Sequence, residues 1–517
     1  MADWAGKLYD IARADLSHTA AMSAFLAVSF HLVIQSVEFE DFMFHFLAVC
    51  TVLWPMLLGF FIHYGQYHPT AAVAKSAVVA TTFQGCLLLS IAVYRLGFHR
   101  CSKFPGPIGA RVSRFYATYL SLKNVQYYRE LEKMHTKYGD FVRTGPREIT
   151  ILRQSAVDII YGPKSQCRKS TWYGQTGNDP LKSSLHMTRD HESHRLRRKA
   201  WDKSMSVKGN IIALASYEPR IMSGVNALVA QLKQRGEDGV NMTDWSMFFS
   251  FDLMGQVGFG KDFGQLHTGQ EHSAIRPIHA HIKTLGIFQT VPWLLYLMSA
   301  IPGAAAAYSE IFDFCANEIR TKQQTWNKEK DPSDIASWLI KAVQEKDVSA
   351  APSPQAIEDD ARIILLAGSD TTATTLSHCL FLVVKYPHEQ KKLQALLDAT
   401  MPGGADDWTF EKVKSIKYLD DFISETLRVK AALTLAGPRE TPAGGLQIDE
   451  VHIPGGVNVL VPAGQIHRDP RYWKQADEFI PERWGERREE MGTDGAPYLP
   501  FLLGRCQLGR LDCIDRV

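Results

Sequence analysis

The feature that most constrains the fold of this chain is the concentration of apolar residues in its first 95 positions. Three apolar runs occur there, at about 20–37, 42–63 and 76–94. Each run approaches the roughly 20 residues that an α-helix needs to cross about 30 Å of hydrocarbon. A cleaved signal peptide does not explain them, because the apolar material recurs three times and no small-residue cleavage site stands out. Buried helices of a soluble domain are the alternative, but the pattern favours a membrane region at residues 1–95.

Basic residues follow the third run, namely Arg95, His99, Arg100 and Lys103. Positive charge beside a membrane exit is typical of the cytosolic side, so three spans would place the N-terminus in the lumen. Next comes the segment Phe104-Pro105-Gly106-Pro107. Because proline fixes φ and has no N–H to donate, this segment cannot continue a helix. Residues 96–109 are therefore predicted to form a stiff, basic and proline-rich hinge.

From residue 110 onward the sequence is typical of a soluble, mainly α domain with small β-sheets. Helical periodicity occurs at 126–138, and β-like composition occurs at 148–152, 446–448 and 457–461, with a turn at 454–456. The net charge is only +2, from 57 basic and 55 acidic residues, which gives no argument for nucleic-acid binding. The eight cysteines are scattered without a CxxC pair, which indicates reduced thiols.

The most informative helix is predicted to start at Ser353-Pro354 and to stop before Pro387. Serine is a favoured cap and proline is tolerated in the first turn, while the apolar stretch from 363 predicts a helix that crosses the domain centre. Gly368, Asp370 and Thr371 are anomalous in that setting. Glycine costs about 1 kcal/mol relative to alanine in a helix interior, and a buried carboxylate costs more unless it is paired. A glycine kink with hydroxyls bonded back to the helix is the plain alternative to a chemical role.

Two further patterns bring charges together. Glu425 and Arg428 lie three residues apart on one helix face and can pair, although an isolated pair of this kind contributes little. The run 190–201 is a basic helix in which His194 and Arg198 share a face, and its plain alternative is an ordinary solvated surface. Both patterns gain significance from the residues near the end of the chain.

The residues Phe501 and Gly504, with the motifs above in this order, resemble the heme-thiolate monooxygenases, the cytochrome P-450 family, of the fungal membrane-bound type. The resemblance covers roughly residues 100–505. The family pattern is Phe-x-x-Gly-x-Arg/His-x-Cys-x-Gly, whose Cys thiolate binds heme iron. Here the ligand position is Leu508, and Cys506 stands where Arg or His is expected. The resemblance therefore implies a cytochrome P-450 domain at 110–517 that lacks its C-terminal end and has a disrupted heme loop, with Cys506 as the candidate metal ligand.

The resemblance also assigns roles to residues that match the motifs of the family. In Ala-Gly-x-Asp-Thr-Thr, Thr371 would hydrogen-bond oxygen, Asp370 would relay protons, and Ala367 and Gly368 would let the cofactor approach. The expected heme-propionate ligands are His194, Arg198 and Arg439. Glu425, Arg428 and Arg483 (in Pro-Glu-Arg-Trp, with Trp484 for Phe) would form a structural network behind the heme loop. The outward-facing cations expected to meet an acidic reductase are Arg195, Arg197, Lys199 and Lys203.

These roles imply an NADPH-dependent oxidoreductase of the endoplasmic reticulum membrane, multi-pass, with its catalytic domain in the cytosol. It would bind heme iron, take electrons from NADPH through a cytochrome reductase, contact membrane lipid, and insert one oxygen atom from O2 into an apolar small molecule. Fungal secondary metabolism, with an alkaloid-like substrate, is the expected setting. The alternatives are an inactive or mis-spliced relative that cannot bind heme, and a non-catalytic membrane-anchored binding protein.

Overall fold

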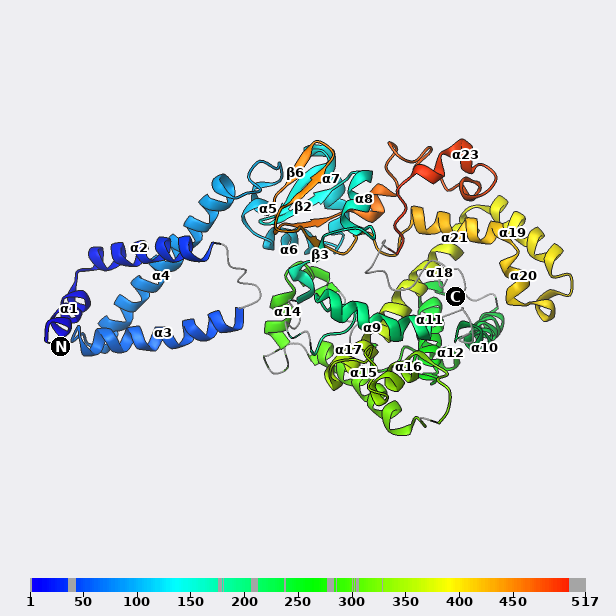
Figure 1. Cartoon of the computed structure of the whole chain (residues 1–517), viewed down its shortest axis with the longest axis horizontal. Coiled ribbons are helices and arrows are strands. Elements are labelled where there is room, and N and C mark those ends of the chain that lie inside the picture. The colour runs from blue at the N-terminus through cyan, green and yellow to red at the C-terminus, as the bar shows by residue number, and fades with distance from the viewer. Residues whose placement is uncertain are drawn as a thin grey trace.

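The computed structural model describes residues 2–35, 43–174, 179, 181–205, 213–236, 239–276, 283–284, 286–299, 301, 303, 306–327 and 329–501. Its N-terminal helices form an arm that projects from a larger helical body, and the small sheets lie between the two (Figure 1). The architecture is mainly helical, as predicted. The heme-loop positions 504–508, including Cys506, lie outside the described residues.

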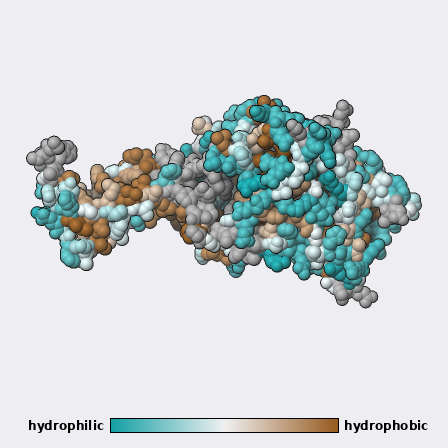
Figure 2. Space-filling model, turned by 90° about the horizontal axis from the view of Figure 1, so that it is seen from below, coloured by the Kyte–Doolittle hydropathy of each residue, from teal (hydrophilic) through white to brown (hydrophobic). Residues whose placement is uncertain are grey.

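Three helices of the arm are long and apolar enough to cross a membrane: α2 (Leu16–Ile34), α3 (Met43–His63) and α4 (Pro69–Val93), the last continuing through the π-helical η2 (Tyr94–Phe98). Hydrophobic surface is concentrated on this arm, whereas the body is mostly hydrophilic (Figure 2). Helix α4 begins before the predicted 76, because Pro69 is tolerated in its first turn. A further helix, α1 (Ala2–Arg13), precedes these three.

Polar contacts join α2 to α4 within the arm. The Ser23 hydroxyl donates to the Val79 carbonyl oxygen at 2.8 Å, and His31 Nδ1 lies 2.8 Å from Ser90 Oγ. Lys75 of α4 is buried and donates from Nζ to the carbonyl oxygen of Ala12, at 2.9 Å. Such bonds satisfy polar groups that a hydrocarbon environment would leave without partners.

A five-stranded sheet with the order β1-β2-β7-β4-β3 packs beside the base of the arm. The neighbours pair antiparallel, except for β2 and β7, which pair in parallel. The strands are β1 (Phe141–Gly145), β2 (Glu148–Ile151), β7 (Asn458–Leu460), β4 (Arg439–Glu440) and β3 (Arg168–Lys169), and a separate hairpin joins β5 (Leu446–Ile448) to β6 (Val451–Ile453). Strands β2, β5 and β7 were predicted, whereas β1, β3, β4 and β6 were not.

Helices make up the rest of the body, and its largest core lies where α9, α11, α15, α16 and the central helix meet. The helices are α5 (Ile108–Val112), α6 (Phe115–Ser121), α7 (Tyr127–Tyr138), α8 (Gln154–Tyr161), η3 (Thr171–Gly174), α9 (His191–Ser204), α10 (Ala213–Arg235), α11 (Met242–Phe259), α12 (Gln265–Thr268), α14 (Pro292–Ser299), α15 (Ala306–Thr325), α16 (Ile335–Gln344), α17 (Pro354–Arg362), η4 (Ile363–Ala367), α18 (Gly368–Lys385), α19 (Pro387–Thr400), η5 (Gly404–Asp407), α20 (Phe410–Lys414), α21 (Lys417–Val429), α22 (Ala463–Ile466), η6 (Pro481–Trp484), α23 (Arg488–Met491) and η7 (Thr493–Gly495).

The central helix is built from α17, η4 and α18 in succession. The Ser353 hydroxyl accepts a bond from the Ala356 N–H and caps its start, as predicted. The π-helical segment η4 ends immediately before Gly368. Insertion of one extra residue into the turn re-aims the side chains that follow, and such segments are frequent at functional sites.

The arm is attached to the body by arginines that donate to backbone carbonyl oxygens. Arg143 of β1 donates to the carbonyl of Arg95 at 2.8 Å, and Arg111 of α5 donates to that of Leu96 at 2.9 Å. In return, Arg95 donates to the Val112 carbonyl at 2.7 Å. Cations thus bind the negative end of the membrane helix, so the predicted hinge sits in a fixed junction.

Candidate functional site

One face of the central helix is open around Thr371. Ala367 and Asp370 are exposed, and Thr371 is partly exposed, although the helix lies in the middle of the body. The Thr371 hydroxyl donates to the carbonyl oxygen of Ala367 at 2.8 Å, and Thr375 repeats the same bond to Thr371 at 2.9 Å. Because the only proton of the Thr371 hydroxyl is used in this way, the oxygen presents its acceptor lone pairs to the open face.

The opposite face packs against α11. A side-chain carbon at Gly368 would lie 2.6 Å from Met254 Cε, and one at Gly258 would lie 2.5 Å from Ile364 Cγ2. The Ser250 hydroxyl donates to the Ser369 carbonyl across the same contact, at 2.8 Å. Gly368 therefore faces α11, whereas Ala367 lies on the open face. Gly368 permits close helix packing, and its cofactor-binding role stays a prediction.

Two histidines, the buried His194 and the half-buried His186, form a second part of the site. His194 of α9 is buried, and its pKa falls to about 3, because burial disfavours the imidazolium and Lys169 and Arg198 add positive charge. Burial also lowers the pKa of His186 to about 3, together with the charges of Lys169 and Arg362. Both histidines are therefore neutral near pH 7, and the charges that act on them are mostly positive, with Asp359 opposing them at His186.

Tyr173 connects the predicted Arg439 to this region. The Arg439 guanidinium lies 5.8 Å from the Tyr173 ring centroid, and its Nη1 is 3.3 Å from the Tyr173 hydroxyl. Lys169 lies on the same ring at 5.5 Å and donates to the carbonyl oxygens of Leu185 and His186, at 3.1 and 2.6 Å. Lys169, Tyr173 and His186 were missed by the sequence analysis, since no spacing pattern joins them to Arg439.

Helix α9 holds His194 in place through a residue whose role was misjudged. Arg197 was expected to face outward, but it is buried at 3% exposure and pairs with Asp360 of α17 at 2.8 Å. A guanidinium this deep needs a carboxylate partner, which the sequence spacing does not show. The other three cations of the expected docking patch, Arg195, Lys199 and Lys203, are exposed. Arg198 is mostly buried and pairs with Asp202 at 3.2 Å.

The third part of the site is the network around Glu425, in which all three charged residues are fully buried. Arg428 donates to both carboxylate oxygens of Glu425 at 2.8 Å, and Arg483 donates from Nε to Oε1 at 3.0 Å. The Trp484 indole N–H donates to Oε2 at 3.0 Å, a bond that a phenylalanine at this position could not make. The structure thus brings together Glu425, Arg428 and Arg483 in the expected arrangement.

The last described residues of the chain rest on this network. The Tyr498 hydroxyl donates to the Ser424 carbonyl at 3.1 Å, and its ring lies 4.4 Å from that of Trp484. The Leu499 N–H donates to His467 Nε2 at 2.8 Å. The segment that leads toward Phe501 is therefore held against the fully buried Glu425 network.

The fold is mainly helical with small sheets, and three of its helices are long and apolar enough to cross a membrane. A family model for cytochrome P-450 matches residues 111–507, and the chain belongs to the cytochrome P-450 family. Cytochrome P-450 monooxygenase orf5 of Eupenicillium brefeldianum is 36% identical over 418 residues, which cover 81% of this chain and 82% of the relative. Tryprostatin B 6-hydroxylase of Aspergillus fumigatus is 29% identical, covering 83% and 74%.

Solved structures agree with this assignment at the level of the fold. The crystal structure of a cytochrome P-450 heme domain superposes with a TM-score of 0.61 at 17% identity, covering 80% of this chain and 87% of that chain. The family implies a heme cofactor and an electron supply from a redox partner.

The described residues fit a heme on two counts. Its propionate carboxylates suit the positive potential around His194, Lys169 and Arg439, where burial strengthens electrostatic interactions. Its flat ring suits the open helix face at the small Ala367, beside which Asp370 and Thr371 supply polar groups. The candidate iron ligand, Cys506, lies outside the described residues.

Proposed function

We propose that this chain is a heme-dependent monooxygenase that inserts one oxygen atom from O2 into an apolar small molecule. The observation that carries the proposal is the pairing of an open helix face, with Thr371 bonded to Ala367, and a buried positive cluster that suits heme propionates. When bound, the heme supplies oxygen activation, which a thiolate ligand assists.

In this function each residue has a defined task. Exposed Asp370 exchanges protons with solvent and passes them along the open face. The Thr371 oxygen accepts a proton or hydrogen bond at its lone pairs, while the Ala367 carbonyl fixes its orientation. Neutral His194 would donate a hydrogen bond to one propionate of the heme, and Arg198 and Arg439 would neutralise the carboxylates. Gly368 allows α18 to stay close to α11.

The Glu425 network has a structural task. It holds η6 and residues 498–499 at fixed positions, so that the loop beyond them starts from a rigid base. Cys506 is the proposed thiolate ligand in that loop. The domain division that goes with this function is a membrane region at 1–95, a hinge at 96–109 and a catalytic domain at 110–517.

The electrons would come from NADPH through a reductase that binds the exposed cations Arg195, Lys199 and Lys203 of α9. We place the arm in the endoplasmic reticulum membrane, as a multi-pass anchor with the catalytic domain in the cytosol. The relatives include a tryprostatin B 6-hydroxylase, which supports a substrate from fungal secondary metabolism, of alkaloid-like character.

Carbon monoxide difference spectroscopy of the expressed full-length chain tests the proposal directly. A Soret band at the position of thiolate-ligated heme is the expected result, and its absence would overturn the active assignment. One observation favours the alternative, an inactive or mis-spliced relative or a non-catalytic binding protein: Leu508 stands at the family's ligand position. Transcript sequencing across codon 505 then shows whether another reading frame restores the ligand.

A matched pair of variants tests the role of Thr371. Thr371→Ala should lower the rate of product formation by roughly 10²-fold, the usual contribution of a positioned proton-transfer group. Thr375→Ala is the control, because Thr375 makes the same bond to the helix one turn later. Equal effects of the two substitutions on product formation would show that the bond serves only the helix.

A further inference from the structure

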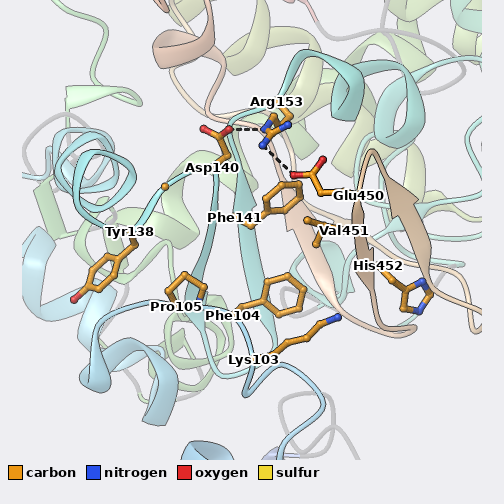
Figure 3. Close-up of a pocket in the computed structure, with 11 residues that line it drawn as sticks. Lys103, Phe104, Pro105, Tyr138, Asp140, Phe141, Arg153, Glu450, Val451 and His452 are labelled. Atoms are coloured by element: carbon orange, nitrogen blue, oxygen red, sulfur yellow. Dashed lines mark hydrogen bonds and ion pairs between the residues drawn. The ribbon is translucent and has the colours of Figure 1, made fainter.

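An open groove of about 640 Å³ lies between the hinge and the β5–β6 hairpin (Figure 3). Phe104 of the hinge and Phe141 of β1 are buried and contribute aromatic rings to it. A cation lies over each ring: Lys103 Nζ is 5.2 Å from the Phe104 centroid, and the Arg153 guanidinium is 5.6 Å from that of Phe141. The groove is thus amphipathic, with apolar rings between two basic side chains.

The charges at one end of the groove are already neutralised. Arg153 pairs with Asp140, and its Nη2 lies 3.2 Å from the Glu450 carboxylate (Figure 3). Asp140 also pairs with Arg471, at 2.8 Å. Each carboxylate here has a cation within bonding distance, so this end does not repel an incoming anion strongly.

The other end carries basic groups that are available to a ligand. Lys103 and His452 are exposed and lie at the same end of the groove in Figure 3. Among the described residues, neither side chain makes an ion pair, and the contact of the Lys103 ammonium is with the Phe104 ring. An anionic group placed here would meet Lys103 without displacing an internal partner.

The end of the groove that carries Lys103 lies close to the third candidate membrane span, which favours an anionic lipid as its ligand. The third candidate span ends at Phe98, five residues before Lys103. The charges that act on the neighbouring His99 and Cys101 come from Lys103 and from arginines. Burial and the arginines Arg143, Arg100 and Arg95 lower the pKa of His99 to about 4. Burial raises the pKa of Cys101 to about 11, against the pull of the cations around it.

Several arginines at this junction donate hydrogen bonds to backbone carbonyl oxygens and not to carboxylates, so their positive charges are not neutralised. Arg143 and Arg111 donate to carbonyl oxygens of the membrane helix, and Arg100 donates to that of Gly456 at 2.9 Å. Within the described part of the chain, none of these three arginines forms an ion pair. The junction of arm and body is therefore a region of positive potential at the membrane boundary.

We propose that this groove binds an anionic phospholipid from the same membrane leaflet. Its headgroup phosphate meets Lys103 and His452, and its glycerol and first acyl carbons cover Pro105 and Val451, next to the buried Phe104 ring. Clusters of basic residues beside a membrane exit attract anionic lipids. The apolar lining of the groove favours an amphiphile over a simple anion, because it can be covered by hydrocarbon. A lipid held there joins the bilayer surface to the hinge and to the β5–β6 hairpin, and thereby sets the tilt of the body.

Native mass spectrometry of the full-length chain tests the site. The protein is reconstituted in bilayers of phosphatidylcholine, alone or with a minority of phosphatidylserine, and the retained lipids are counted. Phosphatidylserine should be retained in preference to phosphatidylcholine. Lys103→Ala should weaken its binding by about fivefold, which corresponds to the roughly 1 kcal/mol expected per basic residue at a membrane surface. Adding His452→Ala should weaken it further.

Lys137→Ala is the matched control. Lys137 is also exposed and also lies over a neighbouring ring, at 5.2 Å from that of Tyr138, but it does not line the groove. A phosphatidylserine with a photoreactive headgroup should label residues of the groove in the unsubstituted chain and in Lys137→Ala, but much less in Lys103→Ala.

Three outcomes would overturn the proposal. Equal losses of phosphatidylserine binding from Lys137→Ala and Lys103→Ala would indicate diffuse attraction to the bilayer. Full competition by inorganic phosphate would indicate a site for a soluble anion. Labelling confined to other parts of the chain would place the lipid elsewhere. Because these readouts do not involve heme, they are independent of the proposed enzymatic function.

Discussion

His467 accepts a hydrogen bond at Nε2 from the backbone N–H of Leu499, at 2.8 Å, while its own carbonyl accepts one from Arg428 Nη1, at 2.9 Å. The imidazole is fully buried, and burial with the nearby Arg428 charge lowers its pKa to about 3. A neutral imidazole can accept at Nε2 only when its proton is on Nδ1. One residue thus joins the Glu425 network to the segment that leads into the C-terminal loop.

Substitution of His467 should loosen the segment around Leu499. The size of the effect should depend on whether the new side chain can accept a hydrogen bond from the Leu499 N–H. In His467→Phe the Leu499 N–H is buried without an acceptor, which costs about 1–3 kcal/mol. Hydrogen exchange of the Leu499 amide should then accelerate by roughly 5- to 150-fold if it proceeds through local opening. His467→Gln can place its side-chain oxygen near the original Nε2 and should exchange more slowly than the Phe variant. Equal exchange in the two variants would show that ring packing alone holds the segment.

Acid should destabilise the fold well before its carboxylates titrate. His194 and His467 each have a pKa near 3 in the folded chain, against an ordinary value of 6.5. As the pH falls below about 6.5, these histidines bind protons in the unfolded chain but not in the folded chain. Their contribution to the free energy of unfolding is therefore fully present above that pH and is lost as the pH falls toward 3. Each histidine contributes a slope of up to about 1.4 kcal/mol per pH unit.

Denaturant unfolding across this pH range measures the slope. His467→Gln removes one titrating group, so its unfolding free energy should depend on pH less steeply than that of the unsubstituted chain. A slope unchanged by the substitution would mean that His467 is protonated in the folded state, which contradicts its role as acceptor for Leu499.

Two neighbouring arginines of α9 should differ strongly in their effect on stability. Arg197→Met leaves the buried Asp360 carboxylate without its guanidinium partner, and loss of one member of a buried pair costs about 3–5 kcal/mol. Arg195→Met removes an exposed pair with Glu192 and should change the unfolding free energy by less than about 1 kcal/mol. Thermal melts of the two variants provide the comparison. Similar melting temperatures would contradict the burial of Arg197.

The departure from the family at Trp484 should be stabilising. Trp484→Phe removes the indole bond to the buried Glu425 carboxylate, and hydrogen bonds to charged groups contribute about 1.5–3 kcal/mol. Trp473→Phe is the control, because the buried Trp473 indole nitrogen has no hydrogen-bond partner among the described residues. Chemical denaturation should therefore show a larger loss for Trp484→Phe. An equal loss would assign the effect to ring volume.

Most features of the fold that were predicted correctly came from local sequence patterns. The cap at Ser353, the helix through Thr371 and the pair Glu425–Arg428 all depend on residues within a few turns of one another, and the structure contains each of them. The π-helical segment before Gly368 was not predicted, and α11 packs closely against the helix there. The same contact, and not the sequence, explains why Gly368 faces Met254.

Contacts between residues that lie far apart in the chain could not be predicted from the spacing of residues in the sequence. Arg197 was expected to face solvent like its neighbours, and only the approach of α17 supplies Asp360, which is 163 positions away in the chain. Lys169 and Tyr173 come from a two-residue strand and a short 3-10 helix, and the pairing of β3 with β4 brings them to Arg439. No periodicity in the sequence marks such a cluster.

The sequence by itself therefore determined the three candidate membrane spans, the mainly helical class and the family to which the chain belongs, because hydrophobic runs and short motifs are local properties. The tertiary structure decided which charges are buried in pairs, which face of the central helix is open, and how the hinge is fastened to the body. Those outcomes depend on contacts between distant segments, where the cost of burying an unpaired polar group selects one arrangement over the others.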